Sequence, residues 1–129
     1  MKRIFTFLLL GSVLMLSAFD TRTGIDEVIG ALRSGNSTQL SAYFDENVEL
    51  TLPDKSDSYS KAQAQLIVKD FFGNNGVRGF ELKHKGEKAG SNYCVGILQT
   101  RGGNFRTTLF MKLKGDKQYL QDISFQQLD

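Results

Sequence analysis

The clearest structural signal in the sequence is residues 91–127, SNYCVGILQTRGGNFRTTLFMKLKGDKQYLQDISFQQ. Apolar and polar residues alternate along this stretch with a period of two, which is typical of strands that bury one face. Gly102-Gly103-Asn104 and Gly115-Asp116-Lys117 interrupt the alternation as turns. The stretch therefore predicts three antiparallel strands joined by hairpins. The middle strand is expected to turn one set of residues inward: Phe105, Thr107, Leu109, Met111 and Leu113.

Two further strands precede these three. Phe80, Leu82 and His84 alternate with charged residues, which predicts a strand that carries all three on one face. Residues 47–52 alternate in the same way, and Pro53 ends that strand because it cannot donate a backbone hydrogen bond. The polar residues that follow Pro53, from Asp54 to Ser58, are expected to form a loop.

Two helices are predicted at the start of the domain. Apolar residues recur at helical spacing over residues 25–32, and Gly35 ends that helix in the left-handed conformation that glycine tolerates. Ser37 is expected to cap a second, shorter helix that continues through Tyr43 and Phe44.

A third helix is predicted in mid-chain. Ser60 and Gln63 form a capping box at its start, and the glycines and asparagines of residues 73–76 end it. The length of 129 residues fits one domain, and 40% apolar with 23% charged residues excludes collagen-like, disordered and disulfide-rich classes. The fold class is therefore α+β: a curved antiparallel sheet of about four to six strands over about three helices.

The first 18 residues have the three-part pattern of a secretory signal peptide. Met1-Lys2-Arg3 is basic, residues 4–16 are almost wholly apolar, and Ser17-Ala18 offers a cleavage site. Cleavage there leaves residues 19–129 as one exported domain, periplasmic or secreted; the alternative is an uncleaved N-terminal anchor. Because Phe19 stands where a lipoprotein has cysteine, no lipid anchor is expected.

The charge balance excludes two partner classes. Removing residues 1–18 takes away Lys2 and Arg3, which leaves 14 basic residues against 14 acidic ones. A neutral domain has no general attraction for nucleic acid or anionic membrane.

Cys94 is the single cysteine and lies in a predicted strand, so it is interpreted as a buried structural thiol.

The order of elements resembles the nuclear-transport-factor-2-like superfamily, a cone-shaped α+β fold shared with ketosteroid isomerases and many ligand-binding proteins. Within it, the chain most resembles small secreted bacterial proteins that share a domain of unknown function. The residues that carry the resemblance are Leu32-x-x-Gly35-Asn36, Phe44-Asp45-x-x-Val48-Glu49, Phe71-Phe72, His84-x-Gly86, Tyr93-x-x-Gly96 and Gly103-x-Phe105-Arg106. Because this superfamily includes enzymes, binders and dimerisation modules, the resemblance implies a fold and no single activity.

The isomerase activity of the superfamily is not expected here. Those enzymes use an aspartate base, a tyrosine and a protonated aspartate. Alignment on the motifs above places Leu50 or Leu52 at the base position, Val28 at the tyrosine position and Leu109 near the second aspartate. Aliphatic side chains cannot transfer or donate a proton, so isomerase chemistry is not expected and no catalytic residues are assigned; whether the protein is an enzyme of another kind stays open.

Weak ligand-binding candidates are His84, Tyr43, Tyr59 and Tyr93. His84 shares a face with Phe80 and Leu82, which places it near the inner side or mouth of the cone; the alternative is a histidine satisfied by a backbone or tyrosine partner. The tyrosines are equally explained as core residues with a polar tip. One histidine offers no pair for a catalytic metal, and no cofactor is expected.

Weak interface candidates lie on the outer face of the sheet. Leu98, Phe110 and Leu120 are expected to project opposite to the inner set, where they would form an apolar patch. Three functional hypotheses remain open. The first is an exported module that binds a small apolar ligand or a protein partner; the second is an uncharacterised enzyme around His84. The third is a structural homodimer with a filled cone.

Overall fold

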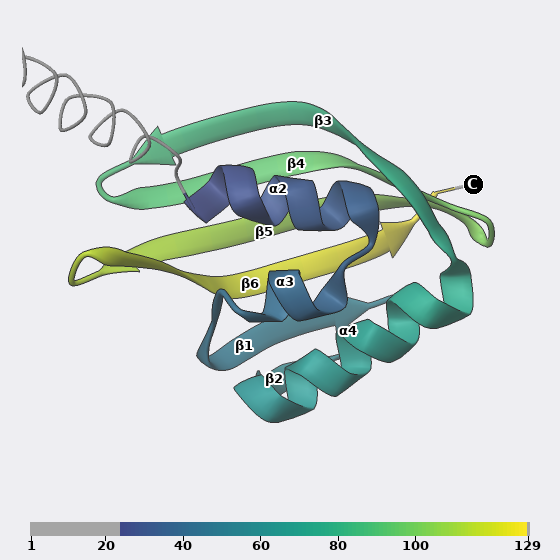
Figure 1. The fold of residues 1–129 in the computed structure, drawn as a ribbon, viewed down its shortest axis with the longest axis horizontal. Helices are drawn as coiled ribbons and strands as arrows, with labels where there is room; N and C mark the ends of the chain where they lie inside the picture. Colours follow the sequence, from purple (N-terminus) through teal and green to yellow (C-terminus); the bar gives the residue numbers. More distant parts are fainter. Residues whose placement is uncertain (1–23, 129) are drawn as a thin grey trace, which may run out of the picture.

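Figure 1 shows a computed structural model of the chain in which residues 24–128 are described: three helices lie against one face of a six-stranded sheet. The predicted signal peptide, residues 1–18, lies outside the described residues. The α+β fold class is confirmed. Along the chain the elements are α2 (Gly24–Ser34), α3 (Ser37–Ser41), β1 (Phe44–Leu52), β2 (Lys55–Ser60), α4 (Lys61–Asn75), β3 (Val77–Lys88), β4 (Ser91–Thr100), β5 (Gly103–Lys114) and β6 (Lys117–Gln127).

The sheet has the strand order β2-β1-β6-β5-β4-β3 (Figure 1). All neighbouring strands are antiparallel except β1 and β6, which pair in parallel. The parallel pair brings the first and last strands of the domain together in the middle of the sheet. None of the helices formed by residues 24–128 combines the length and apolarity that a membrane crossing requires.

The capping signals of the sequence are largely confirmed. The Ser60 hydroxyl accepts a hydrogen bond from the backbone N–H of Gln63, and Gly76 ends α4 with a φ of 68°. The short second helix was predicted less well. Asn36, not Ser37, caps α3 through a 3.0 Å bond from the backbone N–H of Gln39, and the helix ends before Phe44, which begins β1.

The prediction of a loop at residues 54–58 is wrong, because most of this segment belongs to β2. This edge strand pairs with β1 through its backbone, with Tyr59 opposite Val48. It lacks apolar alternation because its side chains, apart from Tyr59, are exposed. Backbone pairing with one neighbour is enough to hold an edge strand, and polar residues there disfavour aggregation.

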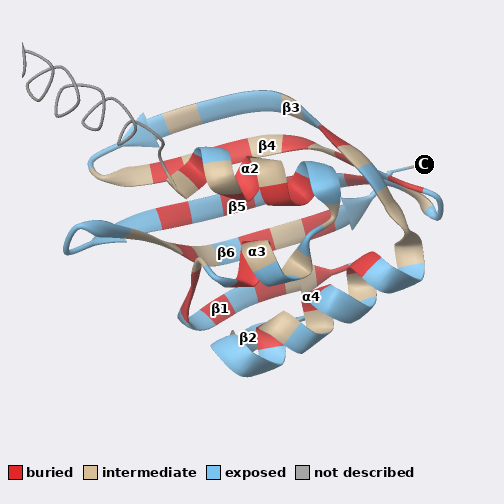
Figure 2. Ribbon diagram, in the orientation of Figure 1, coloured by how far each residue is buried: buried red, intermediate tan, exposed pale blue. Residues whose placement is uncertain are grey.

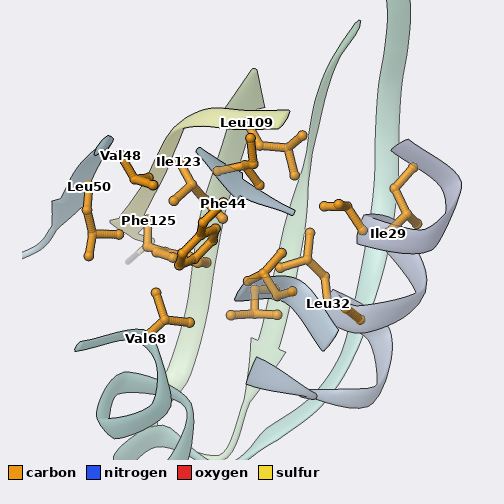
Figure 3. Packing of buried hydrophobic residues seen from close by; sticks show 14 of the residues in the cluster. Ile29, Leu32, Phe44, Val48, Leu50, Val68, Leu109, Ile123 and Phe125 are labelled. Atoms are coloured by element: carbon orange, nitrogen blue, oxygen red, sulfur yellow. The ribbon is translucent and has the colours of Figure 1, made fainter. Parts of the chain in front are cut away.

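Apolar side chains fill the concave side of the sheet. Figure 3 shows Ile29 and Leu32 of α2 and Val68 of α4 converging with strand residues around Phe44. The largest side chains of this cluster are less than 2% exposed: Phe44, Phe125, Leu32, Leu40, Leu50, Leu98, Leu109, Met111, Leu120, Ile123, Val28 and Val48. Burial of this kind stabilises the domain by about 1.5–3 kcal/mol per large side chain. The interior of the cone is therefore packed with the protein's own residues.

Two register shifts change which residues face this core. One lies in β3 between Leu82 and His84, and the other lies between β5 and β6 beside Phe110 and Met111. At each bulge one strand contributes an extra residue, which resets the alternation of the residues that follow. Leu113, predicted to face inward, continues the alternation of Leu109 and Met111 along β5, which the bulge in β6 does not interrupt, but it is 42% exposed near the end of its strand.

Candidate functional site

The convex face of the sheet, opposite the helices, carries an uninterrupted run of apolar side chains. Tyr93, Val95 and Ile97 project from β4 at successive outward positions and are each half-buried, whereas Cys94, Leu98 and the other alternate positions are buried. Phe110 of β5 stands directly opposite Tyr93 and is 38% exposed. We call Tyr93, Val95, Ile97 and Phe110 the convex apolar patch. Figure 2 shows buried residues alternating mainly with half-buried ones along β4 and with exposed ones along β5.

This location corrects the predicted interface residues. Phe110 is outward, as expected, but Leu98 and Leu120 are fully buried in the core. Leu98 faces inward because the hairpin pairs it with the inward residue Phe105. Leu120 faces inward because the bulge in β6 pairs it with Met111.

The apolar alternation of the sequence does not assign Val95 and Ile97 to the outer face, because both sets of alternating residues in β4 are apolar. The Gly102-Gly103 turn does indicate which residues of β4 face outward, because it sets the pairing of β4 with β5. The turn pairs Thr100 with Gly103, and continuing that register places Leu98 opposite Phe105. Since Phe105 was already predicted to face inward, the register alone assigns Val95 and Ile97 to the outer face.

His84 lies at the border of the convex apolar patch, and its predicted position near the inner side of the cone is wrong. The bulge after Leu82 turns His84 to the convex face, where it stands opposite Val95. Its Nε2 atom lies 2.9 Å from the hydroxyl oxygen of Tyr93. The structure therefore agrees with the alternative interpretation of His84, in which a tyrosine is its hydrogen-bond partner.

Two strand glycines leave room for aromatic rings to lie over the sheet. A Cβ at Gly86 would lie 2.5 Å from the ring of Tyr93, and a Cβ at Gly96 would lie 2.3 Å from the ring of Phe80. Gly86 thus lets Tyr93 cover β3 on the convex face, and Gly96 lets Phe80 cover β4 on the concave face. Aromatic rings that shield strand glycines in this way stabilise cross-strand pairing. The motifs His84-x-Gly86 and Tyr93-x-x-Gly96 therefore have a structural role.

Opposite charges flank the convex apolar patch. Asp122 of β6 lies beside Phe110 on one side and Glu49 of β1 on the other, and all three are exposed. Burial and the neighbouring Glu49 raise the pKa of Asp122. Among residues 24–128 neither carboxylate has a salt-bridge partner. Arg106 and Lys112, both exposed, project outward from β5, where they stand opposite Ile97 and Ser91 of β4.

A buried acid marks the edge of the same face. Asp45 is 8% exposed, and its carboxylate accepts 3.0 Å hydrogen bonds from the Lys114 ammonium and the Gln121 amide. Gln121 is the extra residue of the bulge in β6. The hydrogen bond from Gln121, together with those from Lys114 and the backbone of Glu46, lowers the pKa of Asp45. Because every donor is accounted for within the chain, this cluster stabilises the fold.

The remaining candidate residues do not join His84 in one site. Tyr43 lines a separate open hollow of about 710 Å³ beside Tyr119 and Lys61. Partial burial, and to a lesser extent the negative charge of Glu27, raise the pKa of Tyr43. Tyr59 packs against the core from β2. Burial raises the pKa of the Cys94 thiol to about 12, and Cys94 lies wholly inside the core. The described part of the chain contains no cluster of three metal-ligating side chains.

The three positions that align with isomerase catalytic residues lie within the packed core. Val28, Leu50 and Leu109 are each at most 1% exposed. Their side chains offer no proton donor or acceptor. Tyr93 lies next to His84 on the convex face, whereas Tyr43 and Tyr59 lie elsewhere in the fold, and the hypothesis of an enzyme around His84 stays a prediction.

Sequence comparison identifies relatives over nearly the whole described chain. The model of a domain of unknown function, DUF4783, matches residues 25–126. A DUF4783 family protein from Bacteroides uniformis is 34% identical, with a TM-score of 0.78 over 81% of this chain and 96% of that chain. Another from Bacteroides ovatus is 31% identical, with a TM-score of 0.77 over 80% and 94% of the two chains. No curated protein matches the sequence.

A more distant structure supports the fold. A nuclear-transport-factor-2-like protein of unknown function from Cytophaga hutchinsonii superposes with a TM-score of 0.58 at 11% identity, covering 83% of this chain and 92% of that chain. The fold is thus nuclear-transport-factor-2-like, as the order of helices and strands predicted.

Proposed function

The chain belongs to the DUF4783 family, whose function is unknown, and we propose that it is an exported, non-enzymatic binding module that pairs with a second copy of itself through the convex apolar patch. Export is supported by the signal-peptide pattern of residues 1–18. The observation that carries the proposal of pairing is the convex apolar patch itself.

An antiparallel sheet with one solvated face normally places polar residues on that face. Here β4 departs from this rule at three successive outward positions, and Phe110 extends the apolar surface onto β5. The described helices all pack on the other face, so none of them covers these side chains (Figure 1). Contiguous apolar surface of this kind marks an interaction site.

The flanking charges favour a second copy as the partner. Asp122 and Glu49 place uncompensated negative charge on the β6 and β1 side of the patch, and Arg106 and Lys112 place positive charge along β5. A surface that carries both signs beside one apolar patch can pair its own cations with its own anions under twofold rotation, which is the usual symmetry of homodimers. The raised pKa of Asp122 indicates that its charge is destabilising in the single chain, and a cation from the partner would relieve this.

The variant Phe110→Lys tests the proposal. Phe110 exposes about 75 Å², if a phenylalanine presents about 200 Å², so its burial contributes about 2 kcal/mol per copy at 25 cal/mol per Å². Two copies lose about 4 kcal/mol, which weakens association several hundredfold. The new ammonium lies beside Asp122, so the variant should stay folded.

Leu66→Lys is the matched control, because Leu66 is 63% exposed on α4, on the opposite side of the sheet. Native mass spectrometry and sedimentation should show a dimer for the natural sequence and for Leu66→Lys, and a monomer for Phe110→Lys. A monomer of the natural sequence at about 100 μM, well above a micromolar Kd, would refute the proposal. So would a dimer that Phe110→Lys leaves intact.

A further inference from the structure

A groove of about 300 Å³ opens between the second half of α4 and the turn that joins β1 to β2. None of the residues of the convex apolar patch lines it, so it is separate from the proposed dimer surface. Its volume lies at the lower end of the range of small-molecule sites, about 300–1,000 Å³. The apolar part of its lining comes from Leu52, Pro53, Ile67, Phe71 and Phe105.

The floor of the groove is a preformed aromatic cluster. The Phe71 ring centroid lies 4.8 Å from that of Phe125 and 5.1 Å from that of Phe105, with the second pair edge to face. Phe72 adds a fourth ring, 6.2 Å from Phe71. Phe72, Phe105 and Phe125 are buried, whereas Phe71 is half-buried and turns its free surface to the groove. The motif residues Phe71 and Phe105 thus form a rigid apolar floor, so little conformational entropy is lost when a ligand binds on it.

Two carboxylates line the groove, one from each of the elements that border it. Asp54 belongs to the β1–β2 turn and Asp70 to α4, and both are exposed. Neither forms a salt bridge with another residue of 24–128. Lys55 is the cationic residue in the lining, so the groove carries a net charge of one negative unit. The charge complements a cation, and the aromatic floor complements an apolar body.

We propose that this groove binds a small organic cation, a compound that carries one ammonium group on an aromatic or apolar body. The body packs on Phe71, whose ring face also attracts positive charge. The ammonium donates hydrogen bonds to the carboxylates of Asp54 and Asp70. A neutral apolar compound is a poorer fit, because it would remove water from carboxylates without replacing their hydrogen bonds. An anion would be repelled by two carboxylates against one lysine.

The test uses two probes that share a phenyl body and differ in charge: 2-phenylethylammonium and 3-phenylpropionate. The purified protein is titrated with each, and backbone amide shifts are followed by NMR. We expect saturable shifts with the cation, with a Kd of about 1 mM, at Asp54, Phe71 and Asn74, which line the groove. The anion should bind at least about fivefold more weakly.

Isosteric variants separate the charge effect from folding. Asp54→Asn and Asp70→Asn should each weaken binding of the cation about threefold to fivefold, the size of one exposed charge pair. Asp57→Asn is the matched control, because Asp57 is an exposed acid on β2 outside the groove. It should leave the affinity unchanged.

Three results would overturn the proposal: equal affinity for the two probes, an equal effect of Asp57→Asn, or no saturation up to about 20 mM of the cation. Shifts that map to the convex face instead of to α4 and the β1–β2 turn would also overturn it. None of these outcomes bears on dimerisation, which the Phe110→Lys variant tests on its own.

Discussion

Replacing Gly96 with alanine tests how β3 and β4 are held together on the concave face. A Cβ at this position would lie 2.3 Å from Cζ of Phe80 and 2.5 Å from the carbonyl oxygen of Glu81, where ordinary contacts are 3.4–4 Å. The Phe80 ring must therefore leave its place over Gly96. Because the second contact is with backbone, β3 must also move away from β4 by about 1 Å.

The size of the effect follows from what is displaced. Phe80 is 6% exposed, and full burial of a phenylalanine contributes about 1.5–3 kcal/mol. Overpacking with a backbone shift costs about 1–3 kcal/mol. Since part of the ring remains covered in any new position, we expect a loss of about 3 kcal/mol in the free energy of unfolding. For a domain of this length that lowers Tm by about 12 °C.

Urea unfolding followed by circular dichroism measures this loss, and two other glycines serve as comparisons. At Gly86→Ala the atoms nearest the new Cβ all belong to the Tyr93 ring, which lies on the convex face and can swing outward at the expense of its bond to His84, so about 1 kcal/mol should be lost. Gly30→Ala adds a Cβ with nothing within 4 Å inside α2, and should stabilise by up to about 1 kcal/mol. A Gly96→Ala variant no less stable than Gly86→Ala would refute the reasoning.

Two further predictions concern ionisable groups. The pKa of Asp45 in the folded protein lies below its value in the unfolded chain, so the contribution of Asp45 to stability is present above about pH 4 and is lost as the pH falls through the folded-state pKa. The difference in the free energy of unfolding between the natural protein and Asp45→Asn should therefore be largest near neutral pH and small in acid. Urea unfolding from about pH 3 to 7 measures this difference. The Cys94 thiol, with a pKa of about 12 inside the core, should resist thiol reagents at about pH 8 until urea unfolds the protein; labelling of the folded protein at the rate of a free thiol would contradict this.

Local signals in the sequence predicted the elements well and the facing of their side chains less well. Gly76 and the Ser60–Gln63 capping box fixed both ends of α4, because caps depend on neighbouring residues alone. The position of His84 could not be predicted, since its facing depends on a bulge formed between β3 and β4. No composition signal marks that bulge, and one inserted residue moves every following side chain to the other face.

The packed interior also explains why the candidate sites lie on surfaces. Leu50 and Leu109 belong to the core on the concave face, and neither is more than 1% exposed. Sequence alone could not distinguish a lined cone from a filled one, because apolar residues serve both. Because side chains fill the cone, a ligand or partner can contact only residues that the helices leave uncovered.

The departure of β4 from polar-out alternation then becomes the most informative feature of the chain. A strand buried on both faces is apolar on both, and β4 has that composition although helices cover only its concave face (Figure 1). Val95 and Ile97 are only half-buried where they stand, since no described helix packs over them (Figure 1). Their apolar character is explained if a second sheet covers them, and the same face of another copy would bring the opposite charges of Arg106 and Asp122 to the contact.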